Sequence, residues 1–346
     1  MDTTLLSSCL ILLYVSFLLF CFSVPASAGL CNKDDKRALV AIKAAFNNAY
    51  HFASWTNGSA CCTWYDVDCD DRGRVVGLSL FRDDFPGTIP DAVGDLPFLT
   101  SLMFHHLPNL VGPIPPAIGR LSKLRFLDIS WTNVSGPVPN FLASLPSLTG
   151  LDLSFNNLSG PIPSALAHAP ASLNSIDLSR NKLTGPLPPG IFSNTSGAYL
   201  RLSHNGLSGE VPPSYGAVEF LQVDLSRNRF TGDASFLFGR GKGTQQIDLS
   251  RNVFEFDLGK VEFPEAELIA LDLNHNKIYG SIPKQIAEVE NLQLFNVSYN
   301  RLCGEIPTGG RLDRFDQYCY LHNKCLCSAP LPPCNKGRDG DWSRWG

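Results

Sequence analysis

Apolar residues recur along this chain in a fixed pattern at an interval of about 24 residues. The stretch from Leu151 to Pro163, LDLSFNNLSGPIP, is one example, in which Leu151 and Leu153 alternate with polar residues and Asn156 and Leu158 follow. Alternation of this kind is typical of a half-buried strand. The order L-x-L-x-x-N-x-L with this period is the signature of the leucine-rich repeat, in which each unit adds one strand to a parallel sheet.

Ten copies of the pattern predict one continuous core, because each repeat buries its apolar face only against its neighbours. We therefore expect an α/β solenoid, a right-handed leucine-rich-repeat superhelix of about ten 24-residue repeats with a concave parallel β-sheet and disulfide-bonded caps. The predicted segments are a signal peptide (1–28), an N-terminal cap (29–73), the solenoid (74–310), and a C-terminal cap with a polar tail (311–346). The first strand residues of the repeats are Leu78, Leu102, Leu127, Leu151, Ile176, Leu200, Val223, Ile247, Leu271 and Phe295.

The asparagine of the pattern is a candidate for bonding the buried backbone of the turns. The first three repeats carry Asp83, Leu107 and Thr132 in its place. Repeats seven and eight replace the Gly-x-Ile-Pro turn with longer aromatic segments, which we expect to fill the core rather than to bind a ligand. The asparagines of the other repeats are Asn156, Asn181, Asn205, Asn228, Asn252, Asn276 and Asn300.

The first 28 residues have the features of a secretory signal peptide. Leu5 to Phe22 is almost uninterrupted apolar sequence, and Ala26-Ser27-Ala28 fits a cleavage site. The apolar region is longer than usual and no Lys or Arg precedes it, so a retained membrane anchor remains the alternative. We expect a secreted, extracellular protein with no membrane span in the mature chain.

Cysteine placement supports export, because nine of the 11 cysteines lie at the two ends of the mature chain and two lie in the signal segment. Neither end has the spacing of a zinc site, so we expect no metal and no cofactor. The predicted bridges are Cys31 to Cys61, Cys62 to Cys69, Cys303 to Cys325, and Cys327 to Cys334. Cys319 is left without a partner.

Two further features accompany these ends. In the N-terminal cap, Asp34 and Asp35 are expected to precede a helix with Leu39, Ile42 and Phe46 on one face. The N-x-S/T rule predicts N-glycosylation at Asn57, Asn133, Asn157, Asn194 and Asn296.

Charge on this chain is local rather than global. The formal net charge is -4 with no Lys/Arg run, which argues against nucleic acid as a partner. The residue between the two leucines of each strand points away from the core, so six carboxylates stand in one row about 4.8 Å apart. That column is Ser79, Met103, Asp128, Asp152, Asp177, Arg201, Asp224, Asp248, Asp272 and Asn296.

A second column stands where each strand passes into its turn, and it is cationic and aromatic. In the repeat that starts at Leu151, we expect Asp152, Ser154 and Phe155 all to face outward. The alternative is that Asp is the usual filler of this repeat and the adjacent Arg only offsets repulsion between strands. The second column is Arg82, His106, Trp131, Phe155, Arg180, His204, Arg227, Arg251, His275 and Tyr299.

Carboxylates about 5 Å apart match the spacing of the catalytic pair in a retaining glycosidase, which makes catalysis a further alternative. The row is open and repetitive, and nothing in it separates a general acid from a base or nucleophile. Motifs of hydrolases, metalloproteases and phosphate loops are absent from the sequence. We therefore expect no catalytic residues and no enzyme activity.

Several segments resemble one particular family more specifically than the general repeat pattern does. LCNKDDKRAL, CCTWYDVDCD, DLSRNRFTGDASFLFG, KVEFPEAELIALDLNHNKIYGSIP, NVSYNRLCGEIPTGGRL and HNKCLCSAPLPPC are similar to the plant polygalacturonase-inhibiting proteins. The resemblance covers essentially the whole mature chain, and it implies ten repeats, a second small sheet on one flank, the cap bridges above, and a concave binding face. This chain departs from the family at Asp66, where many members have a further cysteine, and at Cys319, where serine is common.

The resemblance implies a secreted defence protein of the cell wall that blocks the substrate cleft of fungal or insect endopolygalacturonases. The alternative is a secreted recognition module that binds a peptide or a receptor ectodomain in development or immunity. The residues expected to contact the partner are Asp152, Asp177, Asp224, Asp248, Asp272, Trp131, Phe155, His204, Gln246 and His275. Three arginines are also expected on the partner-binding face and could alternatively hold pectin itself, namely Arg180, Arg227 and Arg251.

Overall fold

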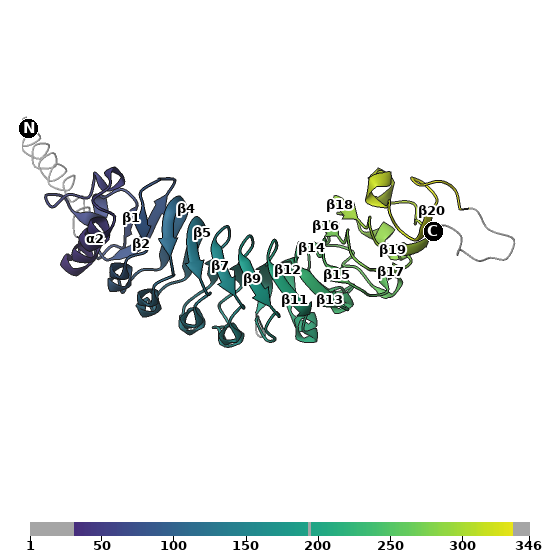
Figure 1. Ribbon diagram of the computed structural model, residues 1–346, viewed down its shortest axis with the longest axis horizontal. Coiled ribbons are helices and arrows are strands. Elements are labelled where there is room, and N and C mark those ends of the chain that lie inside the picture. The colour runs from purple at the N-terminus through teal and green to yellow at the C-terminus, as the bar shows by residue number, and fades with distance from the viewer. Residues whose placement is uncertain (1–30, 193–194, 335–346) are drawn as a thin grey trace, which may run out of the picture.

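The computed structural model describes residues 31–192 and 195–334. These residues form an elongated, curved stack of coils that begins at helix α2 (Lys33–Ala45) and ends at strand β20 (Cys325–Cys327), as Figure 1 shows. The predicted leucine-rich-repeat solenoid is confirmed. The signal segment, Asn194 and the polar tail lie outside the described residues. Within the described ranges, no helix has both the length and the apolar character needed to cross a membrane.

The concave side of the stack is a sheet with one parallel strand from each predicted repeat. Neighbouring repeats pair in register, so that Leu151 lies beside Leu127 and Ile176. Strand β1 (Val67–Cys69) of the N-terminal cap pairs antiparallel with β2 and extends the sheet by one strand. The repeat strands are β2 (Val75–Phe81), β4 (Ser101–Gly112), β5 (Phe126–Gly136), β6 (Gly150–Asp152), β8 (Ser175–Asp177), β10 (Ser196–Arg201), β12 (Glu219–Asp224), β14 (Gln246–Asp248), β16 (Ala270–Asp272) and β18 (Leu294–Asn296).

Short parallel strands on one flank form the second sheet that the family resemblance implied. The C-terminal parts of the long strands β4 and β5 also belong to this flank. An isolated bridge between Asp257 and Tyr279 continues the pairing toward the C-terminal end. The flank strands are β3 (Gly87–Thr88), β7 (Asn157–Gly160), β9 (Lys182–Gly185), β11 (Gly206–Glu210), β13 (Arg229–Gly232), β15 (Val253–Phe254), β17 (Tyr279–Gly280), β19 (Arg301–Glu305) and β20.

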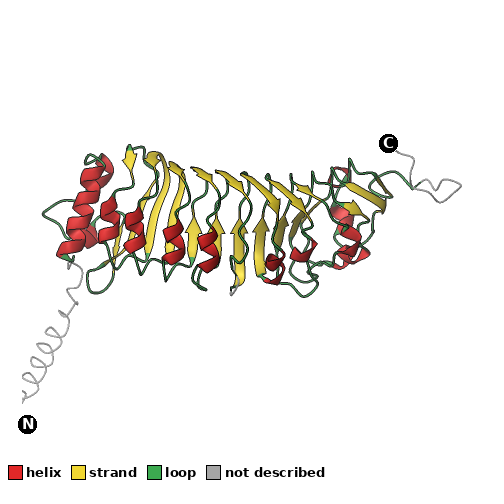
Figure 2. Cartoon of the chain, turned by 60° about the horizontal axis from the view of Figure 1, so that its bottom comes forward, coloured by secondary structure: helices red, strands yellow, loops and turns green. Residues whose placement is uncertain are grey.

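Short 3₁₀ helices follow the flank strands and lie in a row along one side of the molecule, as Figure 2 shows. Most begin directly after a proline that ends the preceding turn, such as Pro163 before η6. They are η3 (Asp91–Asp95), η4 (Pro116–Arg120), η5 (Asn140–Ser144), η6 (Ser164–His168), η7 (Pro213–Ala217), η8 (Ser235–Leu237), η9 (Leu258–Lys260) and η10 (Lys284–Glu288). The caps add η1 (Tyr50–Phe52), η2 (Cys61–Thr63), η11 (Leu312–Arg314) and η12 (Gln317–Cys319).

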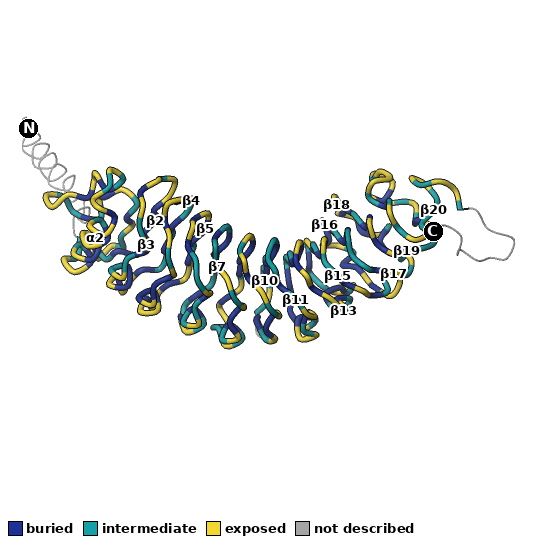
Figure 3. The backbone as a smooth tube through the Cα atoms, viewed as in Figure 1, coloured by how far each residue is buried: buried dark blue, intermediate teal, exposed yellow. Residues whose placement is uncertain are grey.

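The core runs continuously along the inside of the coils, where buried residues alternate with exposed ones in every turn (Figure 3). The two leucines of each strand are buried, as Leu151 and Leu153 illustrate. The aromatic segments of repeats seven and eight also point inward, because Phe238, Phe256 and Phe263 are buried. They fill the core, as predicted.

The asparagine of the pattern ties each coil to its neighbours. Asn228 is buried, and its amide donates to the carbonyl of Leu202 at 2.9 Å and to two carbonyls of its own turn. Its oxygen accepts from the N–H of Leu207 in the preceding repeat at 3.0 Å. In the third repeat Thr132 takes this place and donates to Asn156. The predicted bonding of the buried backbone is therefore confirmed.

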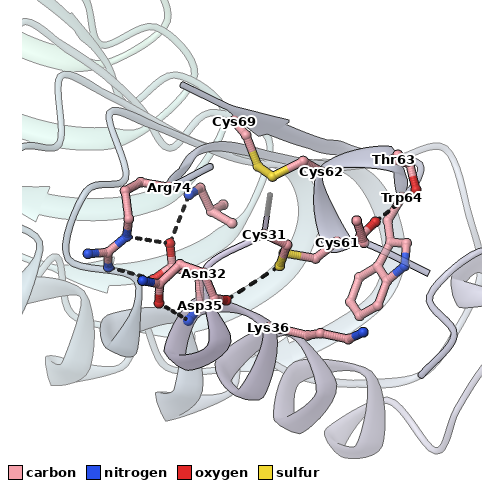
Figure 4. The surroundings of a disulfide bond; sticks show 12 residues. Cys31, Asn32, Asp35, Lys36, Cys61, Cys62, Thr63, Trp64, Cys69 and Arg74 are labelled. Carbon is pink, nitrogen blue, oxygen red and sulfur yellow. Dashed lines mark hydrogen bonds and ion pairs between the residues drawn. A yellow bond between two sulfur atoms is a disulfide. The ribbon is translucent and has the colours of Figure 1, made fainter. Parts of the chain in front are cut away.

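The N-terminal cap closes the first coil with α2 and two disulfides, Cys31–Cys61 and Cys62–Cys69 (Figure 4). Asn32 caps the helix, and its side chain accepts from two backbone N–H groups of the first turn. Asp34 and Asp35 lie within the first turn of the helix rather than ahead of it, at the helix N-terminus that their charge suits. Asp35 is buried and accepts two hydrogen bonds from the guanidinium of Arg74, at 2.7 and 2.9 Å.

A histidine joins this cap to the first repeat. The Nδ1 atom of His51 lies 2.8 Å from the Asp83 carboxylate, and its Nε2 atom lies 2.7 Å from the Asp66 carboxylate. Asp66 has a left-handed backbone, with φ of 68°, and burial raises the pKa of its carboxyl group. Asp83, which replaces the repeat asparagine, thus bonds to the cap instead of to a neighbouring coil.

The C-terminal cap holds the disulfides Cys303–Cys325 and Cys327–Cys334, the pairs expected from the sequence. The first of these joins residues that lie in register on β19 and β20. Cys319 is a free, half-buried thiol, and burial raises its pKa to about 11. The nearby carboxylate of Asp316 contributes to this rise of the thiol pKa.

Candidate partner-binding face

The acidic residues predicted on the concave sheet form one row. Pairing in register places Asp128 beside Asp152 and Asp152 beside Asp177, and it places Asp248 between Asp224 and Asp272. Each of these carboxylates is half-buried between the side chains of neighbouring strands. The row is therefore partly recessed rather than fully exposed.

These carboxylates also accept hydrogen bonds within their own turns. In five repeats one carboxylate oxygen accepts from the backbone N–H two residues later, as Asp152 does from Ser154 at 2.9 Å. Asn296 makes the same contact with Ser298. Ser154 is buried in this arrangement, so the expectation that it faces outward was wrong. The carboxylates thus stabilise the end of the strand and keep a second oxygen for other contacts.

Burial raises the pKa of several carboxyl groups in this row. It raises the pKa of Asp128 and of Asp248 to about 6, although hydrogen bonds from Ser130 and Ser250 lower it again in part. Burial also raises the pKa of Asp177 and Asp272. Neighbouring carboxylates add to the effect at Asp128, Asp177 and Asp248, because like charges disfavour ionisation.

One cation divides the row into two acidic groups. Arg201 lies between Asp177 and Asp224 in the register of the sheet. Its guanidinium donates two hydrogen bonds to the Gln222 side chain, at 2.6 and 3.1 Å, and lies 3.8 Å from the Asp177 carboxylate. The concave face therefore has an acid–base–acid order along the solenoid. Gln246 lies exposed beside Gln222 on the neighbouring strand.

The second predicted column follows the shoulder where the concave sheet ends. Every member has a left-handed backbone, which costs about 1–2 kcal/mol for a residue with a Cβ. The conformation is held by hydrogen bonds to the next coil, such as that from the Phe155 N–H to the Ser179 carbonyl at 2.9 Å. The column consists of Arg82, His106, Trp131, Phe155, Arg180, His204, Arg227, Arg251, His275 and Tyr299, with φ between 52° and 57°.

The column has one further member, His322, that the repeat pattern did not predict. His322 in the C-terminal cap has φ of 61°, and Asn323 bonds to Val297, Tyr320 and Leu302 as the repeat asparagines do. The signal was present in the dipeptide His-Asn, which also occurs at His204 and His275. The repeat pattern does not extend to His322 because the cap lacks the leucines of a full repeat.

Rings on this shoulder stack along the solenoid. Trp131 and Phe155 are parallel with centroids 3.6 Å apart, and the Arg180 guanidinium lies 5.0 Å from the Phe155 ring. At the other end, Tyr299 lies between His275 and His322 at 4.0 and 4.1 Å.

The centre of the shoulder is cationic. Arg180, His204, Arg227 and Arg251 follow one another on consecutive repeats. Burial lowers the pKa of His204, and the adjacent arginines Arg180 and Arg227 lower it further. Burial and Arg251 lower the pKa of His275 in the same way. The fixed positive charge therefore comes from the three arginines.

Four of the five predicted N-glycosylation sites lie within the described residues. Asn57 and Asn133 are exposed, while Asn157 and Asn296 are partly exposed, the last of them on the concave face. Among the described residues, the one close group of candidate metal ligands is Cys31, Cys61 and Cys62, whose sulfur atoms form disulfides.

The fold defines a leucine-rich-repeat protein with a concave parallel sheet. The model of the leucine rich repeat N-terminal domain matches residues 32–70, and that of the leucine rich repeat matches 147–169 and 172–194. Polygalacturonase inhibitor 1 of Arabidopsis thaliana is 52% identical over 94% of this chain and 98% of its own. Polygalacturonase inhibitor of Pyrus communis is 53% identical over 90% and 94%. The chain belongs to the polygalacturonase inhibitor family.

A solved structure agrees with this assignment of the fold. A plant ice-binding protein superimposes with a TM-score of 0.85 at 48% identity, over 88% of this chain and 98% of that one. Both proteins share the coiled architecture over nearly their whole length.

Proposed function

We propose that this protein is a secreted inhibitor that docks its concave face on a pectin-degrading endopolygalacturonase of a pathogen and blocks the substrate cleft. It acts by occlusion and performs no chemistry of its own. The family membership supports the class of target, since the relatives are named as polygalacturonase inhibitors. Four disulfides support export through an oxidising compartment to the cell wall.

The observation that carries the proposal is the acid–base–acid order of the concave row. An enzyme that binds a polyanionic chain needs cations along its cleft, and glycoside hydrolysis needs two carboxylates at the point of cleavage. The acidic groups on either side of Arg201 complement the cations, and Arg201 complements the catalytic carboxylates. Complementary charge of this kind steers association and selects partners.

The shoulder supplies further contacts on one side of the row. Trp131, Phe155, His204 and His275 offer aromatic surface, and Gln246 offers a polar group on the sheet itself. Aromatic and arginine side chains dominate the energy of many interfaces. Arg180, Arg227 and Arg251 are also placed to hold the carboxylates of pectin in the wall beside the docked enzyme.

The test is inhibition by the purified, secreted chain of a broad panel of fungal and insect endopolygalacturonases. Release of reducing ends from polygalacturonate is followed with and without the protein. Dose-dependent inhibition of at least one enzyme is expected. If the folded protein inhibits none of them, the proposal is wrong, and a peptide or receptor ectodomain becomes the partner to seek.

A further inference from the structure

An open hollow lies on the shoulder of repeats two to five, beside the stacked rings. Its volume is about 370 Å³, which is room for one sugar ring with its substituents. Aromatic, amide and guanidinium groups line it together. The lining residues are His106, Pro108, Trp131, Thr132, Asn133, Phe155, Asn156, Asn157 and Arg180.

Two N-glycosylation sequons border this hollow on neighbouring coils. Asn133 and Asn157 each follow an aromatic residue of the shoulder by two positions, namely Trp131 and Phe155. The Asn157 amide donates to the Asn133 side-chain oxygen at 2.8 Å, and the Asn133 amide donates to the Pro108 carbonyl at 2.6 Å. Both acceptor amides therefore lie along one edge of the hollow.

The other described sequons lack this arrangement. Asn57 also follows a tryptophan by two positions, but Trp55 is 3% exposed and its ring is not accessible to a sugar. Asn296 lies on the concave strand β18, and its side-chain oxygen accepts from the N–H and hydroxyl of Ser298. In contrast, Trp131 is 44% exposed although it is stacked on Phe155.

We propose that the hollow seats the first N-acetylglucosamine of an N-linked glycan carried by Asn133 or Asn157. The glycan comes from a lipid-linked diphosphate oligosaccharide in the secretory route. The bond between sugar C1 and the asparagine Nδ2 forms, the bond from C1 to the phosphate oxygen breaks, and the lipid diphosphate leaves while Nδ2 loses a proton. The sugar packs its C–H groups against Trp131, and Arg180 donates to its acetyl carbonyl.

This inference narrows the surface that is left for a protein partner. A sugar in the hollow covers Trp131 and Phe155, so these rings support the glycan instead of contacting the enzyme. The enzyme-facing part of the shoulder then runs from His204 to Tyr299, beside the acidic group of Asp224, Asp248 and Asp272. The inference needs no enzyme target and is tested without one.

The experiment uses the intact protein secreted from plant cells. Glycopeptide mass spectrometry measures occupancy at each sequon, and a peptide N-glycosidase that accepts plant glycans is applied to the native protein. We expect occupancy at Asn133, Asn157 or both. Trp131→Ala should speed native release there about threefold or more, because the sugar loses a contact. Release at those sites should be unchanged in Phe126→Ala, which removes an exposed ring away from the hollow.

A second measurement uses the unaltered protein and guards against a folding defect in the variant. A nuclear Overhauser contact is expected between the acetyl methyl of the first sugar and the indole protons of Trp131. Two empty sequons overturn the inference, as does the absence of that contact in the glycosylated protein. Equal native release from the folded Trp131→Ala variant and the unaltered protein also overturns it.

Discussion

The Nη1 atom of Arg201 lies 3.8 Å from the Oδ2 atom of Asp177 and interrupts the row of carboxylates on the concave face. Gln222 holds the same guanidinium through two hydrogen bonds, so the cation has a fixed position between the two acidic groups. A fixed cation in an acidic row gives the face a charge order that a uniform row lacks. This order is the basis of the proposed fit to a cleft with carboxylates among cations.

Reversing that cation should weaken inhibition. Arg201→Glu places a carboxylate opposite the catalytic carboxylates of the enzyme, and like charges at an interface disfavour the complex. We expect an inhibition constant at least about tenfold higher, which corresponds to about 1.4 kcal/mol. Arg229→Glu, on the flank strand β13, is the matched control and should leave inhibition unchanged. Equal inhibition by both folded variants would remove Arg201 from the interface.

Stability should depend on pH through Asp248. Burial raises its pKa from the ordinary 3.8 to about 6, so the native state binds more protons than the unfolded state between those values. This contribution to stability is present below the unfolded pKa and is lost as pH rises through about 6. Asp248→Asn keeps the oxygen that accepts from Ser250, as Asn296 does naturally with Ser298.

The expected result is a pH-dependent difference in the free energy of unfolding, measured by chemical denaturation. At pH 7.5 Asp248→Asn should be more stable than the unaltered protein by about 1 kcal/mol, after allowance for solvent near the group. Near pH 3.5 the two proteins should be equally stable, since both side chains are then neutral. A constant difference across this range would show that burial of the charge is not the cause.

The repeat asparagine should matter more for stability than any carboxylate of the row. Asn228→Ala removes one of the two side-chain hydrogen bonds to the carbonyl of Leu202, which keeps the one from Asn205, and it removes the side-chain partner of the Leu207 N–H. We expect a loss of about 2–4 kcal/mol in the free energy of unfolding, because buried polar groups without hydrogen bonds are costly. Asn291→Ala, an exposed asparagine with one hydrogen bond, should cost about 1 kcal/mol or less. Similar losses in both variants would contradict this account of the coil.

Cys319 should react slowly in the folded protein. Its pKa of about 11 lies above the ordinary thiol value of 9.0, so its thiolate population at pH 8 is about a hundredfold lower than that of an ordinary cysteine. Alkylation by iodoacetamide at that pH should be correspondingly slow, and it should become fast in guanidinium chloride. Rapid labelling of the native protein would show that the thiol is more exposed than the cap indicates.

Periodicity predicted much of this structure because the repeat itself sets the positions. Leu151, Asp152 and Phe155 could be assigned to the core, the concave face and the shoulder from their places in one repeat. Register between coils then placed Trp131 beside Phe155 and Asp224 beside Asp248. The four disulfides were also predictable, since cysteines gather at the two ends that need caps.

Contacts made by residues outside the repeat pattern could not be predicted from the sequence. His51 contacts Asp66 and Asp83 across loops whose geometry has no repeat signal. The ion pair of Asp35 with Arg74 depends on how the cap helix packs on the first strand. The left-handed shoulder was also missed, because ring and guanidinium residues such as Trp131 and Arg227 seldom adopt that conformation. Hydrogen bonds to the next coil stabilise it there.

The central claim is that the acidic residues of the concave face contact the enzyme. The most direct measurement is the inhibition constant of an inhibited polygalacturonase over a range of salt concentrations, for the variant that carries Asp224→Asn and Asp248→Asn. At an assay pH above about 6, where Asp248 is ionised, these changes remove two charges and keep the turn hydrogen bonds. Glu288→Gln on the exposed helix η10 is the matched neutralisation control.

We predict that the double variant inhibits about tenfold or more weakly at low salt and that its salt dependence is flatter, while the control matches the unaltered protein. An unchanged inhibition constant at every salt concentration, in a folded double variant, would show that the row only supports the coil and would contradict the account.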